Sequence, residues 1–300
     1  METSTSTVTK KPINIDYGRK SKLRGFFRKL TRSWPGMIGF FLIILLMILA
    51  IFGEWIAPFD PMKAELREKL LPPLTDGHLL GTDQLGRDIL SRIIVGTRVS
   101  VIIGLATALL AGIIGTVIGV VSGYFGGWID AVLMRIVDVQ LSFPFILLVL
   151  VISAVLGAGL TNIVISLAVG GWVIFARVIR SEVLALREKE FITAAIATGV
   201  SKLEILVRHI LPNIFTPIII LASLQIGTYI IAEASVSFLG FGVQPPTPAW
   251  GNMLDEGKDY IFSSWWLITF PGIAIILTTL GVNLFGDWLR DTLDPELKGE

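Results

Sequence analysis

Residues 99–129 read VSVIIGLATALLAGIIGTVIGVVSGYFGGWI, a run of 31 residues without a charged side chain. About 20 residues of helix cross the hydrocarbon core of a bilayer, because each residue rises about 1.5 Å along the helix axis. The run is therefore long enough for a transmembrane helix. Four further uncharged and strongly apolar stretches cover residues 33–53, 139–176, 210–232 and 260–286. Together these stretches predict a protein that crosses a membrane several times.

The composition of the whole chain agrees with this interpretation. Of its 300 residues, 53% are hydrophobic and 16% are charged, against roughly a quarter charged in ordinary globular chains. These values exclude a disordered chain, a nucleic-acid-binding domain and a conventional soluble enzyme. The chain has no cysteine, which excludes a disulfide framework, a thiolate metal site and a cysteine nucleophile. His78 and His209, the two histidines, are too far apart in sequence to predict a metal site.

The stretch 139–176 is too long for one crossing. Gly157-Ala158-Gly159 and the polar Thr161-Asn162 pair divide it into two helices joined by a tight turn. The uncharged segment Ala234–Leu254 is not counted because it contains three prolines, and irregular backbone is not tolerated against lipid. The predicted fold is an all-α polytopic membrane protein with six transmembrane helices. The predicted spans are 37–57, 99–122, 134–156, 162–180, 212–233 and 266–286.

The distribution of basic residues predicts the orientation of these spans. Nine Lys/Arg residues lie within 1–36 and four in the loop between the fourth and fifth spans, whereas the loop 234–265 has only Lys258. The positive-inside rule therefore places both termini in the cytoplasm. The loop 58–97 is then extracytoplasmic, although it holds five basic residues, which the rule does not favour.

The predicted organisation has five parts. They are a cytoplasmic basic tail (1–36), a first transmembrane helix (37–57), an extracytoplasmic loop (58–97), a five-helix core (98–289) with a cytoplasmic loop at about 181–211 and an extracytoplasmic loop at about 234–265, and a cytoplasmic tail (290–300).

The basic tail contains apolar residues with helical spacing. Leu23, Phe26, Phe27 and Leu30 fall at i, i+3, i+4 and i+7 among Lys and Arg. This pattern is typical of an amphipathic helix that lies on the inner leaflet of the membrane. A solvated basic tail is the alternative.

The second predicted span carries small residues at every fourth position. Ala111, Gly115, Gly119 and Gly123 lie along one ridge of the helix, where they allow another backbone to approach closely. The sequence favours packing within this subunit, and contact with a partner subunit or a moving interface remains open.

Charged residues are nearly absent from the span interiors. Arg135 and Asp138, three residues apart, are expected to pair with each other, and Arg177 and Arg180 mark the inner end of the fourth span. Glu233 is a possible pathway residue at the outer end of the fifth span, and an interfacial carboxylate in contact with water is the alternative. Carriers driven by protons or ions usually need acids or histidines at mid-membrane depth. Their scarcity argues against a transporter that energises itself.

The chain also lacks the sequence features of an enzyme. It contains no Gly-rich phosphate-binding loop that ends in Gly-Lys-Ser/Thr, no Gly-x-Ser-x-Gly and no His-Glu-x-x-His. We therefore expect no ATP hydrolysis and no other catalysis by this chain.

The loop between the fourth and fifth spans predicts two short helices. Arg187–Thr198 reads as a helix with Phe191, Ala194, Ala195 and Thr198 on one face, and Gly199 is suited to end it. Ser201 to Glu204 then forms a Ser-x-x-Glu capping box, which begins a second helix that runs to Pro212. Small residues on the first helix permit close docking, and the second helix would transmit force to the fifth span.

These residues resemble a known signature. Glu190, Ala194, Ala195 and Gly199, followed by Arg208–Asn213, are similar to the EAA signature of ABC importer permeases. Strict EAA spacing puts the acid directly before the alanine pair, whereas Ile192-Thr193 stands there in this chain.

Other segments resemble the dipeptide/oligopeptide/nickel group of these permeases. They are Gly81–Asp88, Ser237–Gly242, the prolines from Pro245 to Pro248, Gly286–Asp291 and Leu293–Pro295, and the resemblance covers about residues 35–298. The loops 58–97 and 234–265, with Trp250, Trp265 and Trp266, would form either a cap that meets a binding protein or an interfacial aromatic belt.

The resemblance implies a C-type permease subunit with a type I ABC importer fold, in a bacterial or archaeal cytoplasmic membrane. The expected partners are a second homologous permease, two ATPases that bind ATP and Mg²⁺, and an extracytoplasmic solute-binding protein. No cofactor and no nucleic acid are expected in this chain. The implied docking residues are Glu190, Phe191, Ala194, Ala195, Thr198 and Gly199.

The substrate implied by the group is a dipeptide or oligopeptide, with nickel complexes, glutathione and some sugars as open alternatives. A secondary carrier or channel subunit that works without ATPases is the alternative function. A membrane-embedded enzyme is a third possibility, but it would need a cluster of His, Asp or Glu within the spans.

Overall fold

The computed structural model describes residues 28–293, which are helices and loops without a β-strand. The predicted amphipathic helix falls largely outside this range. The principal helices are α2 (Trp34–Ile56), α3 (Ile89–Phe125), α4 (Gly127–Leu141), α5 (Phe145–Leu156), α6 (Leu160–Arg187), α7 (Glu190–Ala197), α8 (Lys202–Glu204), α9 (Leu211–Phe238), α10 (Trp250–Gly257) and α11 (Trp266–Leu293). Short 3₁₀ turns occupy Leu66–Glu68 and Lys258–Tyr260, and a π-helical segment covers Ile205–Ile210.

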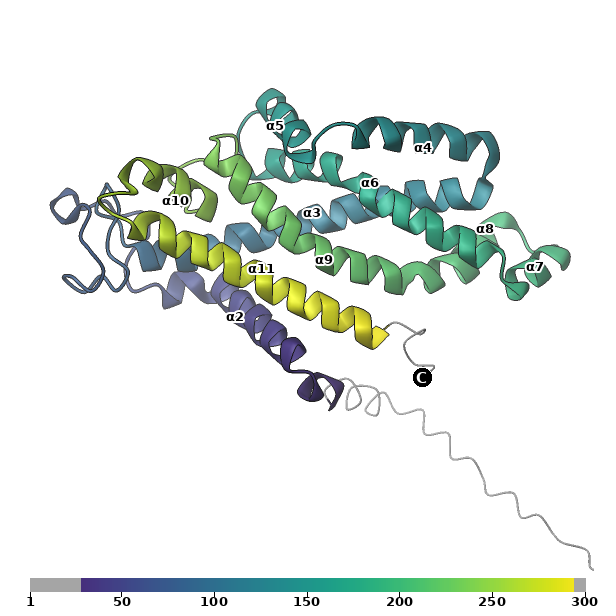
Figure 1. Ribbon diagram of the computed structural model, residues 1–300, viewed down its shortest axis with the longest axis horizontal. Helices are drawn as coiled ribbons and strands as arrows, with labels where there is room; N and C mark the ends of the chain where they lie inside the picture. Colours follow the sequence, from purple (N-terminus) through teal and green to yellow (C-terminus); the bar gives the residue numbers. More distant parts are fainter. Residues whose placement is uncertain (1–27, 294–300) are drawn as a thin grey trace, which may run out of the picture.

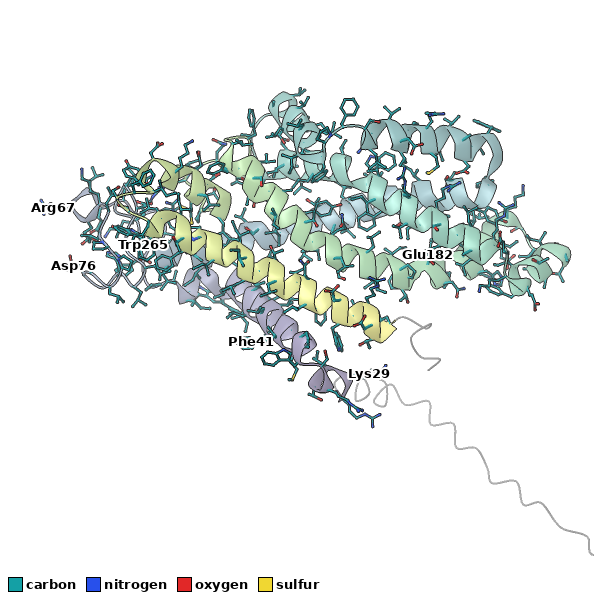
Figure 2. All side chains as sticks on the ribbon, viewed as in Figure 1. Lys29, Phe41, Arg67, Asp76, Glu182 and Trp265 are labelled. Atoms are coloured by element: carbon teal, nitrogen blue, oxygen red, sulfur yellow. The ribbon has the colours of Figure 1, made fainter. Side chains whose placement is uncertain are left out.

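The long helices α2, α3, α6, α9 and α11 run along the long axis of the molecule (Figure 1). Residues 57–88 and α10 lie at one end, which we call the loop end, and α7 and α8 lie at the other, which we call the α7 end. Figure 2 shows Arg67, Asp76 and Trp265 together at the loop end, far from Glu182 on α6. Hairpin connections thus bring distant parts of the sequence to the same end.

Within residues 28–293, five helices are long and apolar enough to cross a membrane, and α4 and α5 would add a sixth crossing if they form one together. The five are α2, α3, α6, a continuous helix over Lys202–Phe238, and α11. The chain is therefore a multi-pass membrane protein, in agreement with the predicted class of fold.

The third predicted span is wrong as a single helix. The stretch 134–156 breaks at Ser142–Pro144, and α4 and α5 meet there at an angle of 90°. Pro144 lies at the N-cap of α5. Proline has no backbone N–H and disfavours the helical conformation of the residue before it, so a helix ends before it and a new one begins after it.

The segment before Pro212 also differs in detail from the prediction. The second loop helix does not stop at Pro212 but continues into α9 through the π-helical segment Ile205–Ile210. The Leu211 N–H donates to the carbonyl of Leu206, five residues back. The wider turn accommodates a proline, which cannot donate to the ladder.

The small residues of α3 pack directly against α6. A Cβ atom on Gly119 would lie 2.6 Å from the carbonyl oxygen of Ala176, and one on Gly123 would lie 2.9 Å from that of Arg180. Gly115 faces the backbone of Trp172 in the same way, and Ala111 is fully buried. The ridge therefore serves the closest helix–helix contact inside this subunit.

Two apolar clusters close the ends of the bundle. At the loop end, Ile89, Trp250 and Trp266 belong to a buried cluster that joins α3, α10 and α11. At the α7 end, Ile192 and Ile205 are buried in a cluster that joins α7 and the π-helical segment to α3, α6 and α9. Each end is thus fixed to the helices that cross the membrane.

Candidate functional site

Helix α7 is anchored by one side chain and leaves most of its surface free. Ile192 is fully buried in the cluster at the α7 end. Glu190, Phe191, Ala194, Thr198 and Gly199 are all exposed. A short helix with one buried anchor and an exposed small-residue face is suited to docking into a groove on another protein.

Ala195 lies at the edge of this face. Its side chain is half-buried and packs against the cluster at the α7 end, and its carbonyl oxygen accepts a hydrogen bond from the Val200 N–H at 3.1 Å. Of the predicted docking residues, Ala195 therefore has a packing role in addition to any contact with a partner.

The turn after α7 depends on glycine. Gly199 has φ +80°, a left-handed conformation that glycine adopts without strain. A Cβ atom at this position would meet nothing within 4 Å, so only the backbone conformation restricts substitution. Ser201 then caps the next helix, because its Oγ accepts a hydrogen bond from the Glu204 N–H at 3.3 Å.

The Glu204 carboxylate accepts a hydrogen bond from Arg208 at 2.6 Å. Of the predicted capping box, the structure shows the hydrogen bond to Ser201. The Glu204 side chain does not reach back to Ser201 and pairs with Arg208, one turn later in the helix. The helix that begins at Lys202 runs on to Phe238. A displacement of α7 thus has a continuous helical connection to the loop end of the molecule.

Sequence reasoning missed three apolar residues beside the predicted face. Ile196, Leu203 and Val207 are exposed, with Leu203 at 71%. Together with Phe191 and Ala194 we call them the α7 patch. Exposed large apolar groups at a helix–turn–helix tip indicate an interaction surface. Leu203 stands between Lys202 and Glu204, whereas Ile196 and Val207 lie in apolar stretches that do not distinguish exposed from buried positions.

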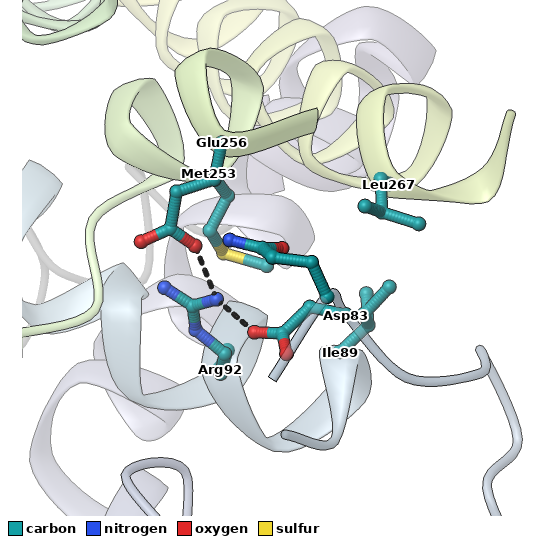
Figure 3. Close-up of a pocket in the computed structure, with 7 residues that line it drawn as sticks. Asp83, Ile89, Arg92, Met253, Glu256 and Leu267 are labelled. Atoms are coloured by element: carbon teal, nitrogen blue, oxygen red, sulfur yellow. Dashed lines mark hydrogen bonds and ion pairs between the residues drawn. The ribbon is translucent and has the colours of Figure 1, made fainter. Parts of the chain in front are cut away.

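The loop end contains a buried charge network that the sequence analysis did not predict. Arg92 Nη1 donates to the carboxylates of Asp83 and, at 2.7 Å, Glu256, as Figure 3 shows. Arg87 donates to Asp83 at 2.6 Å and to Glu256 at 2.7 Å. Two arginines and two carboxylates therefore tie the segment before α3 to α10. We call these four residues the loop-end network.

His78 extends this arrangement. Its Nδ1 lies 2.9 Å from Asp88 Oδ1, and its Nε2 lies 3.3 Å from Glu68 Oε2. Burial by itself lowers the pKa of His78, but the hydrogen bonds to Asp88 and Glu68 outweigh it, so that the pKa is raised above its ordinary value. Asp88 also caps α3 by accepting from the Ser91 N–H at 2.7 Å. The motif Gly81–Asp88 thus folds the loop onto the first turn of α3.

Glu233 is buried within the folded subunit. It is fully buried on α9, and its Oε1 accepts a hydrogen bond from Ser237 Oγ at 2.7 Å. Its other carboxylate oxygen has no hydrogen-bond partner among residues 28–293. Water does not reach the side chain in the isolated subunit, so the residue differs from an interfacial carboxylate.

The expected pair between Arg135 and Asp138 is wrong. Asp138 accepts a hydrogen bond from Arg177 at 2.6 Å, across the contact between α4 and α6. Arg180 pairs in the same way with Asp130 of α4 at 2.5 Å. Side chains three residues apart on one helix are usually within reach of each other. Here Asp138 pairs with Arg177 of the adjacent helix α6 and not with Arg135.

The fold defines a membrane-embedded helical subunit. A family model described as binding-protein-dependent transport system inner membrane component matches residues 115–299, more than half of the chain, and the chain belongs to this family. A second model, described as the N-terminal TM domain of oligopeptide transport permease C, matches residues 21–73.

Curated relatives agree with this assignment. The chain is 44% identical over 274 residues to the glutathione transport system permease protein GsiD of Shigella dysenteriae serotype 1, and the alignment covers 91% of this chain and 90% of the relative. The proteins of the same name from Escherichia coli O6:K15:H31 and Escherichia coli O157:H7 have the same identity and coverage. The chain is therefore a permease subunit of an ABC importer of the peptide type, and ATP hydrolysis belongs to separate subunits.

Proposed function

We propose that this chain forms half of the translocation pathway of an importer for small peptide-type molecules, glutathione included, in a bacterial cytoplasmic membrane. The relatives are named for glutathione transport, and their identity to this chain extends over nearly its whole length. Glutathione is a tripeptide with free carboxylates, so that the proposal falls within the peptide class expected from the sequence.

The observation that carries the coupling part of the proposal is the geometry of α7. The helix exposes Phe191 and Ala194, while Ile192 is held in the bundle. The chain leaves α7 through Gly199 and continues in a single helix to Phe238. Docking of an ATPase on the α7 patch would therefore transmit closure of the ATPases to α9.

The proposed assembly contains this chain, a second homologous permease, two ATPases that bind ATP and Mg²⁺, and a solute-binding protein. The α7 end would face the cytoplasm and the loop end would face outward. The basic residues near α7 support this orientation through the positive-inside rule. The loop-end network would give the binding protein a rigid surface to meet.

Cysteine cross-linking tests the docking directly, because the natural chain contains no cysteine. An Ala194→Cys variant is expressed with its partner permease and ATPases, and a short bifunctional thiol reagent is added. We expect a cross-link between this chain and an ATPase that carries a cysteine in its facing groove. Asp76→Cys, exposed at the loop end (Figure 2), is the matched control and should give no such product.

The same two variants test the orientation. A membrane-impermeant maleimide is added to spheroplasts, whose cytoplasmic membrane is intact. It should label Asp76→Cys and leave Ala194→Cys unlabelled. Labelling of Ala194→Cys alone, or its cross-linking to the binding protein in place of an ATPase, would contradict the proposed function.

A further inference from the structure

A groove of about 340 Å³ lies beside the break between α4 and α5. Its walls are mostly apolar and include Ile136, Phe143 and Val169, and two polar residues, Arg135 and Gln140, also line it. The volume falls in the range of pockets for small ligands, about 300–1,000 Å³. The groove therefore has the size of a binding site for a small molecule, and Arg135 offers a contact for one of its anionic groups.

Arg135 is an unpaired cation in this groove. The side chain is exposed, and within residues 28–293 it makes no hydrogen bond or ion pair. The nearest acid in sequence, Asp138, is already engaged by Arg177 at 2.6 Å. The guanidinium can therefore receive a carboxylate from outside the chain, for which its planar donors are well suited.

The groove is held open by contacts between its walls. Gln140 Nε2 donates to the carbonyl oxygens of Val169 and Gly170, at 2.7 and 3.0 Å. The pair of Asp138 and Arg177 ties the same two helices together near Arg135. These contacts fix the helix that carries Arg135 relative to the apolar wall, whereas the Arg135 side chain itself is free to reach a ligand.

Two observations favour contact of this groove with water. Asp138 on α4 and Arg177 on α6 are each more than half exposed beside the groove, and exposed charged groups on membrane helices usually contact water. The irregular backbone at Ser142–Pro144 is exposed as well. Irregular backbone is tolerated at membrane depth where it is covered by protein or lines a cavity that holds water.

We infer that this groove is a substrate site of the translocation pathway, in which Arg135 binds a carboxylate of the transported peptide-type molecule. The methylene groups of the molecule would lie against Phe143 and its neighbours. This inference rests on the proposed function, and it adds the residue that recognises the charge of the substrate.

The test uses the full importer with its binding protein in proteoliposomes, and it measures uptake of labelled glutathione per ATP hydrolysed. Arg135→Gln should reduce this ratio about tenfold, the factor that corresponds to loss of one charge-assisted hydrogen bond. Arg135→Lys should keep most of it. Arg98→Gln, which alters an exposed arginine paired with Glu54 at 3.1 Å, is the matched control and should change nothing.

A second measurement separates substrate from lipid. In a Val139→Cys variant, which alters another lining residue and keeps Arg135, the new thiol is the only one in this chain, and its labelling by a water-soluble maleimide reports access to the groove. S-methylglutathione, which has the carboxylates but no thiol, should slow the labelling. Replacing phosphatidylcholine by a mixture with phosphatidylglycerol should not.

The outcomes are distinct. Unchanged uptake in Arg135→Gln, or labelling that responds to phosphatidylglycerol and not to S-methylglutathione, would overturn the inference, and the second result would assign Arg135 to a lipid phosphate. If the unaltered importer takes up no glutathione while Ala194→Cys still cross-links to an ATPase, the proposed substrate fails. Assembly of each variant is checked by its copurification with the partner permease and the ATPases.

Discussion

Arg92 on the first turn of α3 and Glu256 on α10 form an ion pair at 2.7 Å, although 164 residues separate them in sequence. The arginine side chain is 2% exposed and the glutamate side chain 17%. Asp83 and Arg87 complete the network, so that the two positive charges are balanced by two negative ones. The balance makes each member necessary, because a buried charge without its partner is costly.

We expect Glu256→Gln to destabilise the loop end by about 3 kcal/mol, since it leaves two buried arginines with one carboxylate. The midpoint of thermal unfolding of the purified permease in detergent measures the effect. Asp255→Asn is the neighbouring control, because Asp255 pairs with the half-exposed Lys258, and surface pairs contribute little. Equal midpoints for the two variants would show that the network does not stabilise the loop end.

The stability of the loop end should depend on pH through His78. Its pKa in the folded protein is raised above the unfolded value of about 6.5 by Asp88 and Glu68, which outweigh burial. Protonated His78 therefore contributes stability that is fully present below the unfolded pKa and is lost as pH rises through the folded pKa.

Trp266, one of eight tryptophans in the chain, lies in this region, where its indole N–H donates to the carbonyl of Thr82 at 3.1 Å. We expect the unfolding midpoint followed by tryptophan fluorescence to fall as pH increases from 6 upward, about the unperturbed histidine pKa. The slope should be reduced in His78→Gln. The same slope in both proteins would assign the pH dependence to other groups.

The contact between α3 and α6 should tolerate an added methyl group at Gly112 but not at Gly119. A Cβ atom on Gly119 would lie 2.6 Å from the Ala176 carbonyl oxygen, whereas one on Gly112 would lie 3.4 Å from the ring of Phe175. Gly119→Ala should therefore destabilise the permease by about 1–3 kcal/mol through overpacking. Gly112→Ala should be neutral or stabilising, since alanine favours helix by about 1 kcal/mol.

Thermal unfolding of the two variants side by side measures this difference. Both substitutions add the same atom to the same helix, so that the comparison isolates the approach of the α6 backbone. A loss of stability in Gly112→Ala alone would mean that the close contact lies elsewhere on α3.

Gly199 should control coupling through its backbone conformation. Its φ of +80° costs a β-branched residue about 1–3 kcal/mol of strain, whereas asparagine tolerates it better. Gly199→Val should shift α7 relative to α9 and lower uptake per ATP hydrolysed several-fold, with the chain still inserted in the membrane. Gly199→Asn should retain most of the coupling. Uptake and ATPase rates of the reconstituted importer measure the ratio, and full coupling in Gly199→Val would argue against a role for this turn.

Docking itself is better tested at Ala194 than at Ala195. Ala195 is half-buried against the cluster at the α7 end, so that a charge there would also disturb folding. Ala194→Asp places the charge on the exposed face and should reduce stimulation of the ATPases without lowering the amount of permease in the membrane. The Ala194→Ser variant, similar in size and uncharged, is the control. Normal stimulation in Ala194→Asp would remove this residue from the docking surface.

The sequence by itself determined the class of fold, because membrane spanning depends on local properties. A helix of about 20 apolar residues satisfies its own backbone hydrogen bonds within lipid. A long uncharged run such as 99–129 therefore predicts a membrane span whatever residues surround it. The turn at Gly199 and the cap at Ser201 were predictable for the same reason, since each depends on the chemistry of a few adjacent residues. The family signature around Ala194 and Gly199 also lies within one short segment.

Only the tertiary structure decided which distant groups meet. The pairing of Asp138 with Arg177 in preference to Arg135, the joining of Arg92 to Glu256, and the burial of Glu233 all depend on how neighbouring helices are placed and rotated. The right-angled break between α4 and α5 was visible in sequence only as Pro144, because a proline specifies that a helix ends but not the direction of the next one. The small residues of α3 marked a close contact in advance, but the identity and rotation of the helix that meets them are set by packing of the whole bundle.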